Sequence, residues 1–327
     1  MRHKIIYCEI DFLRVLFERL SKAYSPLDDN WAEGECARKI IKDVFSQEYV
    51  TIHYDDKQKF RQLLEDNEIF QNMVRCADLT EGYAKMTCDS YTSLEDIGQT
   101  SLNAIYFVVA GEDIASNNGV MALTPSSINN ISLFTDFGKS IEKNSPQSWE
   151  KILKDAKHSC NALMAFDNYL DNGKEFNLYM ILDALLPTKL PVSAPFQISL
   201  FMQEKPGIDL ANERKLIIDK IQQIRPDLPF SLTIYKSYPL DFHDRAIITN
   251  NLWIGSEGGF DLLRKDKRGF RTESSKSTTI HMKYPFLQSN SDAAYGSYSN
   301  FISDAERIAR KNPHYGDAIN RLLSVDV

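Results

Sequence analysis

The spacing of apolar and polar residues predicts strands that alternate with helices in the first half of the chain. Apolar and β-branched runs predict strands at residues 4–10, 49–56, 103–113 and 120–125, and amphipathic spacing predicts helices at residues 12–24, 31–45 and 59–77. Strands in alternation with helices are typical of a mainly parallel, covered sheet. This half is therefore predicted to be a Rossmann-like α/β domain.

A second α/β pattern follows a polar, turn-rich stretch at residues 135–150, where we place a domain boundary. The two predicted domains are residues 1–140 and 141–327. Strands are expected at residues 161–170, 196–202 and 230–236, helices at residues 145–160, 177–187 and 211–226, an antiparallel strand pair at residues 242–250 and 252–257, and two C-terminal cap helices at residues 301–311 and 316–325. Ser145 or Ser148 is the expected N-cap of the first of these helices.

Composition narrows the class of protein. With 327 residues and 43% hydrophobic content, the chain is long enough for two cores. No run of 18 apolar residues occurs, and Glu9 and Asp11 interrupt the N-terminal apolar stretch, so a cytoplasmic protein without a transmembrane segment is expected. The five cysteines are scattered, which favours reduced thiols. A net charge of -7 argues against a protein that coats duplex nucleic acid, although a local basic site remains compatible with it.

Residues 241–260 (DFHDRAIITNNLWIGSEGGF) carry the most distinctive chemistry. On a strand, His243 and Arg245 point to one face and Asp244 to the other. An imidazole beside a guanidinium suits a phosphodiester, because one moves protons near neutral pH and the other offers a planar fork of donors. The returning strand ends at Gly255-Ser256, where backbone N–H groups allow close approach of a phosphate.

This hairpin resembles the second-half hairpin of the phospholipase D superfamily. In that pattern His-x-Lys is followed after four residues by Asp, and after six more by Gly-Ser. His243 stands at the histidine position, Arg245 replaces the lysine and Asn250 the aspartate, and Gly255-Ser256 follows after four residues. Some degenerate members of the superfamily carry the same His-Asp-Arg triplet.

The resemblance extends over about residues 148–286 and implies a phospholipase D-like α/β domain that needs no cofactor at the His243 site. It implies His243 as nucleophile or acid-base group, Arg245 as phosphate holder, and Asn250 and Ser256 as assisting residues. The hydrolases of the superfamily use two motifs, and single-motif members assemble the site across a homodimer. A related domain of MIT-domain proteins keeps the fold as a binding module.

A second His-x-Lys spacing occurs at His281 and Lys283, with Gln288 at the aspartate position. It offers a second motif within one chain. The residues after it are polar and include a proline where a strand hairpin is needed, so the favoured interpretation is a strand with an exposed lysine.

A basic segment follows the hairpin and is a candidate for contacts with phosphate groups. It holds six basic residues against Asp266 and Glu273, namely Arg264, Lys265, Lys267, Arg268, Arg271 and Lys276. Such a cluster suits a nucleic-acid backbone or an anionic lipid head group. A solvated loop is the alternative.

Acidic residues near the predicted strand ends of the first domain are a second candidate site. Glu9, Asp11 and Asp113 resemble the carboxylates that PIN-like nucleases gather around a divalent metal. Strand-end carboxylates also act as caps or solvated turns, so this metal site is one of two interpretations.

The sequence therefore predicts a phosphodiester-directed protein that binds nucleic acid, of the kind that the resemblance implies for bacterial defence or mobile-element systems. Whether it also cleaves depends on the activity of the degenerate motif. One alternative is a noncatalytic module for a protein partner, in which residues 243–245 stabilise the hairpin. A second alternative is a module that binds anionic lipid.

Overall fold

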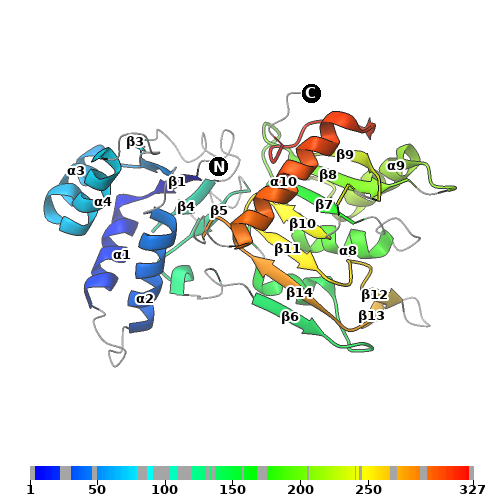
Figure 1. Ribbon diagram of the computed structural model, residues 1–327, viewed down its shortest axis with the longest axis horizontal. Helices are drawn as coiled ribbons and strands as arrows, with labels where there is room; N and C mark the ends of the chain where they lie inside the picture. Colours follow the sequence, from blue (N-terminus) through cyan, green and yellow to red (C-terminus); the bar gives the residue numbers. More distant parts are fainter. Residues whose placement is uncertain are drawn as a thin grey trace. The chain divides into compact units, whose positions relative to one another are not determined.

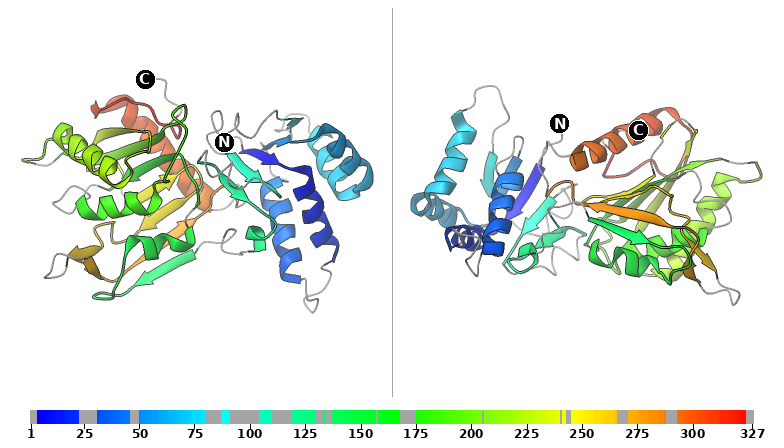
Figure 2. Two further views of the ribbon diagram at one scale, coloured as in Figure 1. Left: turned by 180° about the vertical axis from the view of Figure 1, so that it is seen from behind. Right: turned by 60° about the horizontal axis from the view of Figure 1, so that its bottom comes forward.

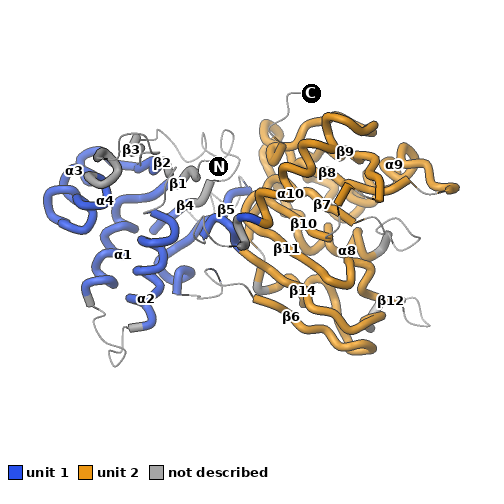
Figure 3. The backbone as a smooth tube through the Cα atoms, in the orientation of Figure 1, with its two compact units in different colours: residues 1–135, 284–296 blue, residues 136–283, 297–327 orange. Residues whose placement is uncertain are grey.

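The computed structural model describes residues 4–22, 31–45, 50–79, 87–90, 104–109, 119–129, 133, 137–156, 158–167, 175–204, 206–239, 241–242, 245–265, 271–287 and 293–323. The chain divides into two compact units, residues 1–135 with 284–296 and residues 136–283 with 297–327 (Figure 3). Each unit contains a β-sheet and helices, which confirms the α/β class. Among the described residues, no helix has the length and apolarity needed to cross a membrane.

The first unit is built on a five-stranded parallel sheet in the order β3-β2-β1-β4-β5, a Rossmann-like order (Figure 1). Its elements are β1 (Lys4–Cys8), α1 (Ile10–Lys22), α2 (Trp31–Ile40), a π-helical turn (Ile41–Phe45), β2 (Val50–Tyr54), α3 (Lys57–Asp66), α4 (Glu68–Leu79), β3 (Thr87–Ser90), β4 (Ala104–Phe107), β5 (Met121–Leu123) and a 3-10 turn (Ser127–Asn129). Ile6, Ile52 and Phe107 are fully buried. Apolar strands of this kind form the centre of a covered parallel sheet.

The second unit is built on an eight-stranded mixed sheet in the order β15-β9-β8-β7-β10-β11-β14-β6. Its elements are β6 (Phe137–Ile141), α7 (Trp149–Leu153), a 3-10 turn (Lys154–Ala156), β7 (Ala162–Phe166), α8 (Glu175–Leu185), β8 (Phe196–Gln203), α9 (Leu210–Ile224), β9 (Phe230–Ser237), β10 (Ala246–Thr249), β11 (Trp253–Ser256), β12 (Leu263–Lys265), β13 (Arg271–Ser274), β14 (Thr278–Lys283), α10 (Ala293–Lys311) and β15 (His314–Tyr315). Strands β7, β8 and β9 are parallel, whereas β10, β11, β14 and β6 run antiparallel to their neighbours. β12 and β13 form a separate hairpin.

Helices cover both faces of this sheet. Figure 2 shows α10 on one face and α8 with α9 on the other. Phe301 of α10 packs against Phe166 of β7, with ring centroids 5.4 Å apart. Trp149 of α7 is fully buried, and its indole N–H donates to Asn177 of α8. The expected N-cap at Ser148 is confirmed, because its hydroxyl accepts the backbone N–H of Lys151 at 3.1 Å.

Among the described residues, the structure has a strand that the sequence did not predict and lacks a helix that it did. The polar stretch chosen as a boundary contains β6, which pairs with β14, and its alternating burial is typical of an edge strand with one covered face. The second cap helix does not form in the described residues 316–323. Here Asn320 is buried and donates to Leu163 O at 3.2 Å and Ser199 Oγ at 3.0 Å, so side-chain bonds to the sheet replace helical backbone bonds.

Asn320 provides a test of this C-terminal segment. Asn320→Ala is expected to lower the free energy of unfolding by about 2 to 3 kcal/mol, because buried acceptors on the sheet lose their donor. Ile319→Ala is the matched control, since that side chain is 61% exposed. Urea denaturation would measure both variants. Equal stability of the two variants would contradict the role given to Asn320.

Candidate functional site

A pocket of about 340 Å³ lies in the second unit, where β10, β11 and β14 meet α10. Its lining residues are Arg245, Trp253, Gly255, Ser256, Glu257, His281, Ser297 and Phe301. The predicted antiparallel pairing of the hairpin is confirmed, with Ala246 opposite Gly255. β14 continues the sheet, with His281 opposite Gly255. Residues of β11, β14 and α10, with Arg245 just before β10 and Glu257 just after β11, therefore form one concave surface.

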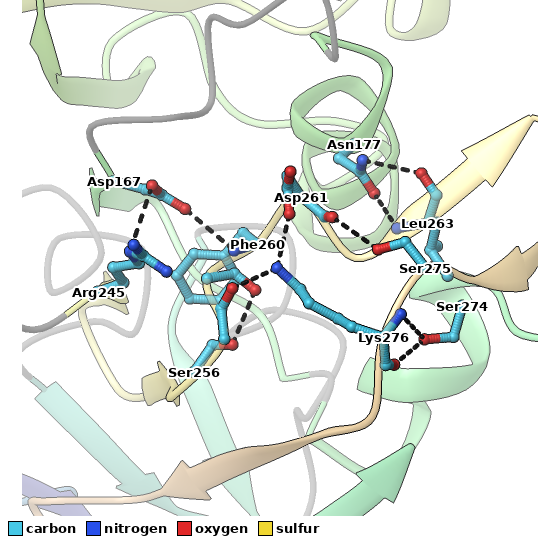
Figure 4. Close-up of polar contacts among 12 residues, drawn as sticks. Asp167, Asn177, Arg245, Ser256, Phe260, Asp261, Leu263, Ser274, Ser275 and Lys276 are labelled. Carbon is cyan, nitrogen blue, oxygen red and sulfur yellow. Dashed lines mark hydrogen bonds and ion pairs between the residues drawn. The ribbon is translucent and has the colours of Figure 1, made fainter. Parts of the chain in front are cut away.

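Arg245 forms an ion pair with a buried carboxylate, that of Asp167. Asp167, which follows β7, is 1% exposed, and its Oδ1 lies 3.8 Å from Arg245 Nε (Figure 4). Its Oδ2 accepts the backbone N–H of Phe260 at 3.0 Å. Gly259 has a φ of 78°, and a Cβ there would lie 2.6 Å from Arg245 Nη1, so the chain at this point approaches the guanidinium closely. The arginine side chain is still 30% exposed, which leaves it accessible from the pocket.

The turn from Ser256 to Gly259 is braced by side chains that the sequence assigned to the site. Ser256 Oγ donates to Gly259 O at 2.8 Å. Lys276 Nζ contacts Gly258 O and pairs with Asp261 Oδ1 at 2.7 Å (Figure 4). In this geometry Ser256 and Lys276 fix the loop that carries Glu257.

Asn250 is not brought together with Arg245 and Ser256. It is buried in the turn between β10 and β11, where its Oδ1 accepts the backbone N–H of Asn161 at 3.0 Å. The four residues of β10 lie between it and Arg245, and these five steps along a strand correspond to roughly 16 Å. Its position therefore fits a residue that anchors the hairpin at the end of β10 that is far from Arg245.

His243 and Asp244 lie outside the described residues, whereas His281 is in the pocket. The sequence favoured a strand with an exposed lysine for the second His-x-Lys spacing, and the strand forms as β14. The sequence signal that could have placed His281 is the alternation of buried and partly exposed side chains in Thr278–Lys283, where Ile280 and Met282 are buried. Pro285 follows this strand and does not interrupt it.

The basic segment forms the β12 to β13 hairpin. Arg264 lies opposite Glu273 in its register, and Lys265 opposite Arg271. Lys267 and Arg268 lie outside the described residues. Since Lys276 is bound to Asp261, this segment has less free positive charge than its composition indicated.

The acidic residues of the first unit have structural partners. Glu9 Oε2 accepts the backbone N–H of Val109 at 2.6 Å, and Asp11 pairs with Lys59 at 2.6 Å. Asp113 lies outside the described residues. In the part of the chain that the structure describes, no three His, Cys, Asp or Glu side chains are grouped to hold a metal ion.

Burial, with Asp55 and Glu9 nearby, raises the pKa of the Cys8 thiol, so it stays protonated at neutral pH.

The contact between Asp167 and Arg245 can be tested by removing its charge. Asp167→Asn is expected to lower the free energy of unfolding at pH 7 by about 2 kcal/mol, because the arginine loses a buried anionic partner. Asp183→Asn is the matched control. It breaks a pair with Arg225 in which the carboxylate is 53% exposed, and such pairs contribute about 1 kcal/mol or less. Thermal and urea unfolding would compare the two, and a larger loss in the control would refute the assignment.

The resemblance to the phospholipase D superfamily rests on residues 243–260, of which the structure describes all but the first two. The arginine and the Gly-Ser pair of this motif meet at the pocket, while Asn250 lies away from it. A search of protein-family models finds no match to the chain, and a search of curated proteins finds none either. Membership of the superfamily therefore stays a prediction from these residues.

Proposed function

We propose that the pocket of the second unit binds the phosphodiester backbone of a nucleic acid in the cytoplasm, with Arg245 as the phosphate contact. The observation that carries the proposal is a partly exposed guanidinium, oriented by the buried Asp167 at the wall of a pocket. A guanidinium presents a fork of N–H donors that matches phosphate oxygens. The ion pair with Asp167 restricts the guanidinium before binding, which reduces the entropy lost on binding.

The other walls of the pocket support a nucleotide in preference to an isolated phosphate. Trp253 lies over Gly255, where a Cβ would come within 2.1 Å of its ring, and its centroid is 6.3 Å from that of Phe301. Aromatic rings beside a cation are a common platform for bases of single-stranded nucleic acids. A volume of about 340 Å³ is within the usual range for small-ligand sites.

Among the described residues, the polar contacts of Ser256 and Asn250 favour a binding role over a role in cleavage. The Ser256 hydroxyl donates to Gly259 O, and the Asn250 carbonyl oxygen accepts from Asn161, so both groups are used inside the fold. Cleavage by the predicted mechanism requires His243 as nucleophile, alone or opposed to a second copy in a homodimer. The same observation favours a noncatalytic protein-interaction module as the second candidate function.

Removal of the guanidinium tests the proposed function. Arg245→Ala is expected to weaken binding of a labelled single-stranded DNA or RNA oligonucleotide by about ten- to a hundredfold, because a charge-assisted hydrogen bond is lost. Arg310→Ala removes the same charge from an exposed position on α10 and serves as the control. Fluorescence anisotropy would measure both variants, with anionic liposomes as competitor. Equal affinities for the two variants, or displacement by liposomes alone, would reject the proposal.

Cleavage is tested separately with His243→Ala. Labelled single- and double-stranded DNA and RNA would be incubated with the protein, with and without divalent metal. Metal-independent cutting that is lost in the variant is expected if the resemblance extends to activity. Binding without cutting would favour a nucleic-acid-binding module, and metal-dependent cutting retained in the variant would move the reaction to the acidic residues of the first unit.

A further inference from the structure

A second pocket of the second unit, with a volume of about 310 Å³, lies between α9 and the outer edge of β9. It shares no lining residue with the pocket at Arg245. Strand β15 pairs with β9 only at Ile234 and Tyr235, so the preceding residues of β9 have no neighbouring strand on this side in the described part of the chain. The pocket lies along this uncovered stretch of the strand.

Arg214 of α9 is fixed against the same edge by its Nε atom. The Nε–H group donates to Leu232 O at 2.8 Å. Gly316 has a φ of 109°, and a Cβ there would lie 2.4 Å from Leu232 O and 2.6 Å from Arg214 Nε, so a glycine is needed for the chain to pass this contact. Among the described residues, the two Nη groups of Arg214 have no partner. The guanidinium therefore keeps its terminal N–H donors for the pocket that it lines.

Asp317 adds a carboxylate at the same end of the pocket, because it follows Gly316 directly. Its backbone carbonyl accepts the hydroxyl of Thr233 and the N–H of Ile319, and these bonds hold the turn in place. Its side chain is exposed. In the part of the chain that the structure describes, no ion pair joins Asp317 to Arg214 or to another cation. Two opposite charges therefore line one end of the pocket without neutralising each other.

The remainder of the pocket is largely apolar. Arg214, Ile218 and Gln222 are spaced four residues apart, so they lie along one face of α9 and extend about 12 Å along its axis. Beyond the end of the helix the chain turns into β9, and apolar side chains close the pocket there. The apolar lining residues are Ile218, Pro226, Leu228, Phe230 and Leu232. The pocket is thus charged at one end and apolar at the other.

Other charged groups around this pocket lie outside its lining. Arg225, which follows α9, donates to Asp183 Oδ1 of α8 at 2.7 Å. The remaining charged residues of α9 and of its connection to β9 are also absent from the lining, namely Glu213, Lys215, Asp219, Lys220 and Asp227. The lining itself therefore carries one positive and one negative charge.

We infer that this pocket binds a free α-amino acid with an apolar side chain. The α-carboxylate accepts N–H groups from the guanidinium of Arg214, and the α-ammonium group pairs with Asp317. The side chain of the ligand lies along the apolar walls. A zwitterion matches both charges, whereas a simple anion meets the carboxylate of Asp317 and a simple cation meets Arg214. The volume of the pocket is within the range of small-ligand sites.

Isothermal titration calorimetry of the full chain with L-phenylalanine and two analogues tests the inference. Phenethylamine lacks the carboxylate and is expected to bind about ten- to a hundredfold more weakly, because the charge-assisted bonds to Arg214 are lost. Hydrocinnamate lacks the ammonium group and is expected to bind about three- to fivefold more weakly, because Asp317 is exposed and exposed ion pairs are weak. Binding of phenethylamine as tight as that of L-phenylalanine would overturn the inference.

Three variants locate the ligand in this pocket. Arg214→Lys keeps the charge but loses the planar fork, and it is expected to weaken L-phenylalanine binding about tenfold. Asp317→Asn is expected to abolish the preference for L-phenylalanine over hydrocinnamate. Asp219→Asn is the matched control, since it removes an exposed carboxylate of α9 outside the lining. Gln222→Trp fills the pocket from an exposed position without changing either charge, and it is expected to block binding.

Circular dichroism would establish that each variant is folded. Binding of L-phenylalanine to Gln222→Trp with the affinity of wild type would overturn the inference, even if Arg214→Lys did not fold. Absence of binding by both L-phenylalanine and L-leucine would overturn it as well. Neither result bears on the proposed function, because the two pockets share no residue.

Discussion

The buried carboxylate of Asp167 is the constraint on which the pocket depends. A charged group that is 1% exposed is stable only if nearby cations and N–H groups compensate for its lost hydration. Arg245 supplies the cation and Phe260 the N–H group. Arg245 lies at the start of the β10 to β11 hairpin, and Phe260 lies in the turn that follows it. The same requirement that stabilises Asp167 therefore fixes the arginine and shapes the adjacent loop.

The polar residues of the hairpin fall into two groups with different uses. Ser256, Asn250 and Lys276 are bound to backbone or side-chain groups within the fold, where they hold the turns at each end. Arg245 and Glu257 keep part of their surface in contact with solvent at the pocket. A rigid base with a few exposed charged groups is the arrangement expected of a preorganised binding site.

Local patterns predicted most of the elements, because apolar runs and amphipathic spacing are strong signals for buried strands and covered helices. The hairpin was correctly paired from its two short strands and the Asn-Asn turn between them. The pairing of strands that are far apart in the chain could not be predicted from the sequence. The contact of β6 with β14 joins segments more than 130 residues apart, and its strand carries glycine and lysine instead of an apolar run.

The candidate site shows the same division. Arg245 and Ser256 were found because they flank the hairpin, and both line the pocket. Asn250 was grouped with them by motif spacing, but a turn residue lies a full strand length away from the strand's other end. His281 was set aside because proline follows it closely, although a proline after the last residue of a strand is compatible with that strand.

The acidity of the chain limits the way in which it can recognise an anion. A net charge of -7 provides no long-range attraction for a polyanion, so binding on the proposed function depends on contacts within the pocket. For a single-stranded ligand, the slope of log affinity against log salt concentration becomes about 0.7 smaller in magnitude for each phosphate that is not contacted. A single contact at Arg245 thus implies weak salt dependence. Aromatic contact with Trp253 must then supply a substantial part of the affinity, which favours an unpaired base over a duplex whose bases are stacked inside.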